Sequence, residues 1–176
     1  MADFAAFLPM VLKFEGGFAD DRADSGGITN KGITLTTFFG CAQRILNAAP
    51  TLENLRSLTD RQAGDIYRAL YWNVVQGDEM PLQDLANIVC DFYVNAGVNA
   101  TKLLQQVMNE CGAAVAVDGS IGPASVRELA ALDQTEVYRR YKAGRAAYYE
   151  NLARAQPGLS KFLDGWLDRV NSFPDL

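Results

Sequence analysis

The sequence predicts a mainly α-helical protein, a helical bundle with one small β-hairpin. Apolar residues recur at three- and four-residue spacing in segments along most of the chain, as in amphipathic helices. Residues 16–34 are instead dense in Gly, Asp, Ser and Asn, a composition typical of turns and short hairpins. The chain shows no internal repeat and no Ser/Pro-rich linker, so we expect one globular protein.

The first predicted helix spans about Asp3 to Phe14. Phe4, Phe7 and Val11 place its apolar residues on one face. Pro9 lies inside this segment, where it would remove a backbone hydrogen bond and crowd the preceding turn. We therefore expect the helix either to bend at Pro9 or to restart with Pro9 in its first turn.

The polar stretch at residues 16–34 ends this helix and is the least helical part of the chain. Short apolar segments at Phe18 and Ile28–Ile33 flank its most polar part. Their spacing predicts that they pair as a small β-hairpin.

Later helices are predicted from apolar periodicity and from residues that favour helix ends. Thr59 followed by Gln62 is a capping-box pattern, and Pro81 and Pro123 stand where helices can begin. The expected helices cover residues 38–50, 59–72, 82–95, 101–110, 123–132, 134–155 and 160–170.

The composition excludes several classes of function. Sixteen basic and 21 acidic residues give a net charge of -5 without long runs of one sign, so we expect no nucleic-acid partner. The chain contains no histidine, which excludes Ser-His-Asp and Cys-His catalysis and imidazole metal sites. We expect no metal and no cofactor, and we assign acid and base chemistry to carboxylates. No apolar run approaches the roughly 18 residues of a membrane-spanning segment.

Glu15 is the strongest candidate for such chemistry. It follows Val11 by four residues, so it continues the apolar face of the first helix at its C-terminal end. Apolar surroundings and the negative end of the helix dipole both disfavour the charged carboxylate, so Glu15 should keep its proton to unusually high pH. A general acid for sugar cleavage needs this property. The structural alternative is a helix-terminal glutamate paired with Lys or Arg, and spacing alone does not decide between the two.

The polar loop offers a second carboxylate from Asp20, Asp21 or Asp24. If the loop doubles back as a hairpin, Asp24 returns towards the end of the first helix and stays ionised there. Alternatively, aspartates in Gly-rich turns bond their own backbone, or bind calcium, although the EF-hand spacing is lacking. The residues alone predict a helical protein with a carboxylate-bearing loop.

A dense motif runs from the end of the first helix through this loop. It consists of Glu15-Gly16-Gly17-Phe18, Asp24, Gly26-Gly27, Thr29 and Gly32-Ile33-Thr34. This motif resembles that of the family 108 glycoside hydrolases, N-acetylmuramidases formerly described as secretion activators, and the resemblance extends over nearly the whole chain. The order Glu, Asp, Thr is also similar to that of phage lysozymes. The resemblance implies a lysozyme-like α+β fold with a cleft beside the hairpin and Glu15 as the general acid.

The same resemblance implies roles for two further residues of the motif. Asp24 would be the second carboxylate, and Thr29 would help to hold the attacking water. This loop is more charged than in many relatives, which often carry Asn and Pro here, so Asp20 or Asp21 competes with Asp24 for that role.

Four residues further along are predicted to bind substrate. The segment Asp91-Phe92-Tyr93-Val94-Asn95-Ala96-Gly97 is similar to one that lies beside the cleft in these muramidases, which implies that Asp91 and Asn95 contact the sugar. Asn95 is equally suited to bonding an acetamido group and to capping a helix. Tyr71 and Trp72 could stack on a sugar face, but an aromatic pair at the end of an amphipathic helix also suits the core.

The C-terminal part carries a second resemblance. The segment from Val117 to Pro123 is similar to the Asp-Gly-x-x-Gly-Pro loop of peptidoglycan-binding modules, although Asp118 and Gly122 also suit a tight turn before a Pro-initiated helix. We therefore expect a catalytic part at residues 1–94 and a peptidoglycan-binding part at residues 95–176, packed as one globular unit.

The resulting hypothesis is a peptidoglycan hydrolase that cleaves the β-1,4 bond between N-acetylmuramic acid and N-acetylglucosamine. The alternatives are a lytic transglycosylase that uses a single Glu, and a non-catalytic wall-binding or secretion-associated protein. The expected partner is the peptidoglycan glycan strand, and we expect a monomer. The N-terminus shows no signal peptide, which favours a phage- or prophage-type enzyme held in the cytoplasm until a holin or exporter gives it access to the cell wall.

Overall fold

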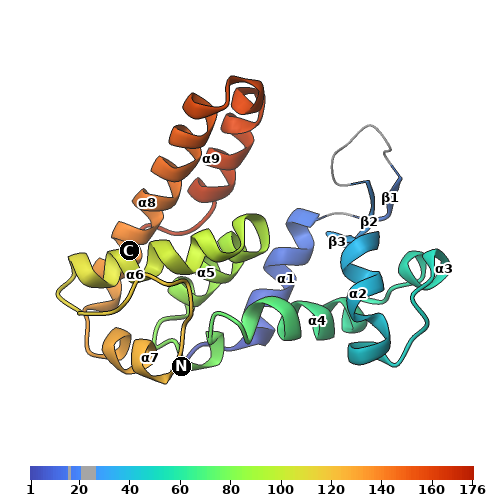
Figure 1. Ribbon diagram of the computed structural model, residues 1–176, viewed down its shortest axis with the longest axis horizontal. Coiled ribbons are helices and arrows are strands. Elements are labelled where there is room, and N and C mark those ends of the chain that lie inside the picture. Colours follow the sequence, from blue (N-terminus) through green and yellow to red (C-terminus); the bar gives the residue numbers. More distant parts are fainter. Residues whose placement is uncertain (16, 21–26) are drawn as a thin grey trace. The chain divides into compact units, whose positions relative to one another are not determined.

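The computed structural model describes residues 1–15, 17–20 and 27–176. The side chains of Phe14, Glu15 and Asp20 also lie outside the described part. The described chain forms two compact units. The N-terminal unit is Phe4–Asn73, and the C-terminal unit is Val74–Leu176 together with Met1–Asp3. Figure 1 shows that helices make up most of both units, so the predicted mainly helical class with a small β element is confirmed.

The N-terminal unit combines helices with short strands. In chain order its elements are α1 (Phe4–Glu15), β1 (Ala19–Asp20), β2 (Ile28–Asn30), β3 (Ile33–Thr34), α2 (Leu35–Leu46), α3 (Leu52–Arg56), α4 (Asp60–Tyr67) and the π-helical turn η1 (Arg68–Trp72). In α1 the side chains of Phe4, Phe7 and Val11 are buried on one face, as predicted. The helix continues through Pro9 to Glu15, so Pro9 neither ends it nor restarts it.

Capping residues set the starts of the later helices in this unit. The predicted capping box at the start of α4 is confirmed, because Thr59 and Gln62 bond each other's backbone N–H groups. Thr51 caps the short helix α3 by accepting a hydrogen bond from the Asn54 N–H. The sequence did not predict α3, because five residues are too few to show a helical period.

The described strands form an antiparallel sheet in the order β1-β2-β3. Ala19 lies opposite Thr29, as expected for a hairpin between the segments at Phe18 and Ile28. The predicted segment Ile28–Ile33 is two strands instead of one, because the chain turns back at Lys31 and pairs Asn30 with Ile33. The central strand β2 thus carries Thr29 between two neighbours.

The C-terminal unit is entirely helical in its described elements. They are the 3-10 turn η2 (Gly77–Glu79), α5 (Gln83–Ala96), α6 (Val98–Glu110), α7 (Pro123–Ala130), α8 (Gln134–Ala155), the 3-10 segment η3 (Pro157–Phe162) and α9 (Leu163–Asn171). Helix α5 is the core of this unit: Leu85, Ile88, Val89 and Phe92 are fully buried, and α5 packs against both α6 and α8. Helices α8 and α9 run side by side as an antiparallel pair (Figure 1).

The backbone N–H groups of the first residues bind the C-terminal unit through hydrogen bonds. The N–H of Ala2 donates to the Met80 carbonyl over 2.8 Å, and the N–H of Asp3 donates to Gln83 Oε1 over 2.7 Å. Of the helices described, none has the length and apolar character needed to span a bilayer.

Candidate active site

The predicted general acid is the last residue of α1. The buried residues Phe7 and Val11 precede it on that helix. The side chain of Glu15 and all of Asp24 lie outside the described residues. The roles of both residues therefore stay predictions.

Thr29 occupies the middle strand of the sheet. It pairs with Ala19 on one side and with Thr34 on the other. Residues directly opposite each other in an antiparallel pair project from the same face, so Thr29 and Thr34 lie side by side. Thr34 is used structurally, because its hydroxyl accepts a hydrogen bond from the Thr37 N–H and caps α2. In the described part of the chain the Thr29 hydroxyl has no protein partner, which leaves it available to water or substrate.

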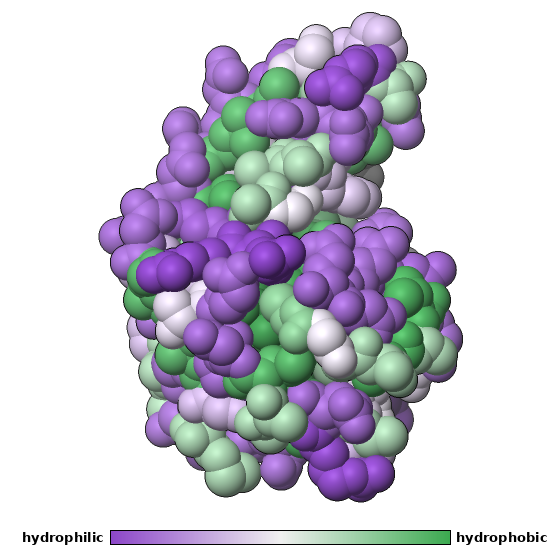
Figure 2. All heavy atoms as spheres, turned by 90° about the vertical axis from the view of Figure 1, so that its left-hand side faces the viewer, coloured by the Kyte–Doolittle hydropathy of each residue, from purple (hydrophilic) through white to green (hydrophobic). Residues whose placement is uncertain are grey.

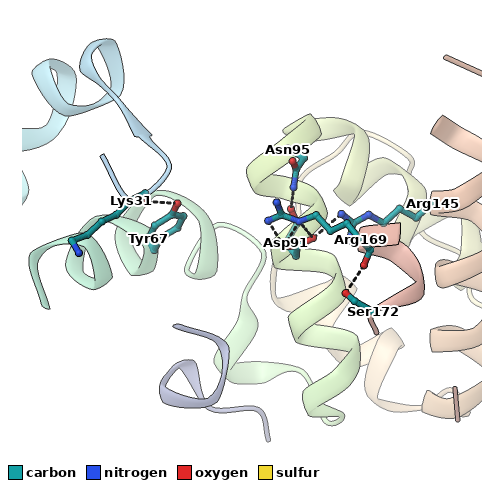
Figure 3. A network of polar contacts seen from close by, with 7 residues as sticks. All are labelled: Lys31, Tyr67, Asp91, Asn95, Arg145, Arg169 and Ser172. Atoms are coloured by element: carbon teal, nitrogen blue, oxygen red, sulfur yellow. Dashed lines mark hydrogen bonds and ion pairs between the residues drawn. The ribbon is translucent and has the colours of Figure 1, made fainter. Parts of the chain in front are cut away.

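The turn that follows Thr29 is held in a fixed conformation. Lys31 and Gly32 have φ angles of 51° and 74°, the arrangement of a two-residue type I′ hairpin turn. The Tyr67 hydroxyl of α4 donates a hydrogen bond of 2.9 Å to the Lys31 carbonyl (Figure 3). Lys31 Nζ also lies 2.5 Å from the carboxylate of Asp60. Helix α4 thereby fixes the end of the strand that carries Thr29.

A second anchor comes from Asn30. Its side chain is buried, and its Nδ2 donates to the carbonyls of Leu55 and Arg56 at 2.8 and 3.0 Å. These bonds attach β2 to the end of α3. Sequence reasoning missed the roles of Asn30 and Tyr67, since the only local signal was the Asn-Lys-Gly turn pattern.

Asp91 lies in the centre of a buried ion cluster within the C-terminal unit (Figure 3). Arg145 of α8 donates to Asp91 Oδ2 over 2.6 Å, and Arg169 of α9 donates to Asp91 Oδ1 over 2.7 Å. The side chains of Asp91 and Arg145 are both 0% exposed, and that of Arg169 is 16% exposed. The Arg145 guanidinium also lies over the ring of Phe92, 5.1 Å from its centroid. The sequence predicts Asp91 as a substrate ligand. In the structure its buried carboxylate links α5 to α8 and α9 through the two arginines.

The same environment makes the neighbouring thiol unreactive. Burial, with a smaller contribution from the Asp91 carboxylate, holds the pKa of Cys90 well above its ordinary range. A thiol is a weak nucleophile when it is protonated. Cys90 is also fully buried, so it packs in the core of this unit.

Asn95 forms a hydrogen bond within its own helix, and its contact with an acetamido group stays a prediction. Its Nδ2 donates a hydrogen bond of 2.7 Å to the Asp91 carbonyl, one turn earlier in α5. The residue is exposed, and within the described chain its Oδ1 has no partner. The amide oxygen can therefore accept a hydrogen bond from a ligand while the nitrogen stays bound to the helix.

The two predicted aromatic residues are placed differently. The Trp72 side chain is fully buried and packs against Phe4 and Phe7, with ring centroids 5.7 and 5.3 Å apart. Trp72 is therefore a core residue, and its ring has no exposed surface on which a sugar could stack. Tyr71 is partly exposed and contacts the Tyr67 ring at 5.5 Å, so it retains some surface for a ligand.

The Asp118-Gly119-Ser120 loop is held by buried polar side chains of α6. Gln105 Nε2 donates to Asp118 Oδ1 over 2.9 Å, and its Oε1 accepts from the Gly119 N–H over 2.7 Å. The Thr101 hydroxyl donates to the Gly119 carbonyl over 2.7 Å. The bonds from Gln105 and from the Ser120 N–H hold the pKa of Asp118 below its ordinary value. The motif residues thus fix a backbone turn, one of the two roles considered from the sequence.

The comparisons with known proteins agree with this arrangement. Residues 8–97 match the family model described as Glycosyl hydrolase 108, and residues 99–171 match the model described as Predicted Peptidoglycan domain. The solved structure of Brucella abortus SagA is similar, with 29% identity and a TM-score of 0.71 over 97% of this chain and 94% of that chain. Among curated proteins, none matches this chain.

These matches confirm the predicted lysozyme-like fold class and the resemblance to family 108. They also support a glycoside hydrolase whose substrate is peptidoglycan. Within the described residues, no cluster of three or more acidic or cysteine side chains has the geometry to hold a metal ion.

Proposed function

Because the chain belongs to the glycosyl hydrolase 108 family, we propose that it is an N-acetylmuramidase with Glu15 as its general acid. The bond cleaved is the β-1,4 linkage between N-acetylmuramic acid and N-acetylglucosamine. The family match over residues 8–97, which contains the whole motif from Glu15 to Thr34, is the observation that carries the proposal.

In this mechanism Glu15 protonates the oxygen of the leaving sugar while the cleaved sugar becomes oxocarbenium-like. The position of Glu15 at the C-terminal end of α1 supports this role, because the negative end of the helix dipole favours the protonated carboxyl group. An acid must be protonated when the substrate binds, so this placement suits the task.

Asp24 and Thr29 take the complementary roles. Asp24, as an ionised carboxylate, stabilises the positive charge on the sugar or activates water. Thr29 helps to hold that water, which its hydroxyl can do because it has no partner in the described chain. Carboxyl groups separated by about 6.5 to 9.5 Å would give inversion at the anomeric carbon, and about 5 Å would give retention.

Analysis of the products tests the reaction. Purified sacculi digested by the protein should yield fragments that end in reducing N-acetylmuramic acid, detected by mass spectrometry after borohydride reduction. Fragments that end in 1,6-anhydro-N-acetylmuramic acid would identify a lytic transglycosylase instead. Sacculi that bind the protein and release no fragments would identify a wall-binding protein without activity.

A further inference from the structure

A groove lies on the C-terminal unit between α6 and α8. Its volume is about 360 Å³. Its polar lining comes from Asn99, Lys102 and Gln106 of α6 and from Tyr148 and Asn151 of α8. Residues at spacings of three, four and seven share one face of a helix, so each helix presents a single face to the groove.

Small residues keep the floor of this groove low. Gly144 and Ala147 of α8 lie in the floor together with Leu103 of α6. A Cβ atom at Gly144 would lie 2.9 Å from Leu103 Cδ1, so the glycine allows α6 and α8 to approach closely. Figure 2 views the molecule from the left-hand side of Figure 1, where α6 and α7 lie. On this side, hydrophilic side chains surround smaller apolar patches. The groove therefore combines an apolar floor with a polar rim.

The rim carries amide groups with free hydrogen-bonding capacity. Asn99 Nδ2 donates to the Ala96 carbonyl over 3.1 Å and to the Tyr148 hydroxyl over 3.3 Å. Asn99 Oδ1 and the whole amide of Gln106 have no partner within the described residues. Asn151 Oδ1 accepts from Arg154 over 3.0 Å, which leaves its Nδ2 to donate. The rim thus offers both donors and acceptors.

Lys102 adds one positive charge at a defined place. A Cβ atom built on Gly119 would lie 3.4 Å from Lys102 Cγ and 3.6 Å from its Cε, so the aliphatic part of Lys102 lies along the Asp118-Gly119 loop. Among the described residues Lys102 forms no ion pair. Its ammonium group is available to an anionic ligand.

We propose that this groove binds a muramyl-peptide unit of peptidoglycan. An acetamido sugar presents an N–H and a carbonyl that match the Asn and Gln side chains, and its apolar face suits the Gly144-Ala147 floor. A carboxylate of the lactyl-peptide portion pairs with Lys102.

Two features of the chain favour this occupant over others. Every lining residue falls within residues 99–171, which match the predicted peptidoglycan domain. None belongs to residues 8–97, which carry Glu15 and match the hydrolase family. The groove would therefore be a second binding site for peptidoglycan, formed by residues 99–171 and separate from the residues that match the hydrolase family. The inference rests on the proposed function only in its choice of substrate.

Co-sedimentation of the full chain with purified sacculi tests the groove. Lys102→Glu should weaken binding by roughly fivefold, since it replaces an attractive charge by a repulsive one at an exposed pair. Lys161→Glu is the matched control, because Lys161 is also exposed, lies in the same domain and does not line the groove. This control should bind as the parent does. Ala147→Trp fills the groove without a charge change and should also weaken binding, and circular dichroism checks that each variant is folded.

The outcomes separate the groove from the reaction. The inference is overturned if Lys102→Glu and Ala147→Trp sediment with sacculi as the parent does. It is also overturned if Lys161→Glu loses as much binding as Lys102→Glu, because that result would show only a general electrostatic attraction to the wall. The proposed function is read independently, from the reducing ends that the unmodified protein releases. If the unmodified protein released no reducing ends, the proposed function would fail, but the comparison of binding among the variants would still hold.

Discussion

At the scale of single residues, the buried charges of the C-terminal unit show most clearly how the fold depends on distant positions. Asp91 meets Arg145 and Arg169, which are 54 and 78 residues away in the sequence. A buried carboxylate is stable only when it is paired and hydrogen-bonded. The local sequence could identify Asp91 as part of a motif but could not show that two arginines surround it.

Asp91→Asn is expected to destabilise the protein by about 3 to 5 kcal/mol, because it removes the negative charge that pairs with the fully buried guanidinium of Arg145. Urea unfolding followed by circular dichroism measures this. Asp164→Asn, at an exposed position of α9, is the control and should change the free energy of unfolding by less than about 0.5 kcal/mol. A free energy for Asp91→Asn within about 1 kcal/mol of the parent would show that the cluster is not stabilising.

The ionisation of the Tyr138 hydroxyl should make the stability of the protein depend on pH in the alkaline range. Its hydroxyl donates a hydrogen bond of 2.6 Å to the Pro174 carbonyl. Burial, with smaller contributions from Asp84 and Asp175, raises the pKa of Tyr138 to about 12. A tyrosine in the unfolded chain ionises near pH 10. The contribution of the protonated Tyr138 hydroxyl to stability is therefore complete below about pH 10 and is lost as the pH rises through about 12.

The free energy of unfolding should therefore fall between about pH 10 and about pH 12, and Tyr138→Phe should fall less steeply. Denaturant titrations across this range measure both slopes. Burial also raises the pKa of Tyr141, so some fall should remain in the variant. Identical slopes for parent and variant would show that Tyr138 does not ionise on unfolding in this range.

At the scale of elements, the sequence predicted those features whose signals are local. The capping box at Thr59 and the start of a helix at Pro123 depend on residues within one turn, and both are confirmed. The positive φ of Lys31 could not be predicted, because its hairpin turn is fixed by Tyr67, which is 36 residues away. Spacing alone made Glu15 and Asp24 candidates, but only the family motif favoured a catalytic role, since a helix-terminal glutamate or a turn aspartate is also common without function.

The loop before α7 gives a test at this scale. Gly119 has a φ of +84°, and a Cβ atom there would lie 2.2 Å from Val98 Cγ2. Gly119→Ala should therefore destabilise the protein by at least about 1 kcal/mol, through both backbone strain and the clash. Thermal unfolding measures the change.

Gly165→Ala is the matched control. Gly165 lies inside α9, and a Cβ atom there would have no neighbour within 4 Å. Alanine favours helix over glycine by about 1 kcal/mol, so this variant should be more stable than the parent. If Gly119→Ala is also stabilising, the loop does not have the conformation described.

At the scale of the whole molecule, the two family matches do not coincide with the two compact units. The hydrolase match ends at residue 97 and so includes α5, whereas α5 is the core of the unit formed by Val74–Leu176 and Met1–Asp3. Helix α5 packs against α6 and α8, which lie in the predicted peptidoglycan domain. The division at residues 94 and 95 expected from the sequence stays a prediction.

A chain truncated to residues 1–97 should fail to fold cooperatively. It would expose the apolar side chains of α5, including Ile88, Val89 and Phe92, and would remove both arginines that pair with Asp91. Differential scanning calorimetry of the fragment and of the full chain compares them. A sharp unfolding transition for the fragment would show that α5 does not need the helices that follow it.

The central claim is that Glu15 donates the proton to the glycosidic oxygen, and replacing this one carboxyl group by an amide tests it most directly. Release of reducing ends from purified sacculi is measured for the parent, for Glu15→Gln and for Glu53→Gln, an exposed glutamate of α3 that receives the same change. Glu15→Gln should remain folded and lose at least about a hundredfold in rate, as expected for loss of a general acid, while Glu53→Gln keeps the parental rate. Digestion of sacculi by folded Glu15→Gln at the parental rate would contradict the account.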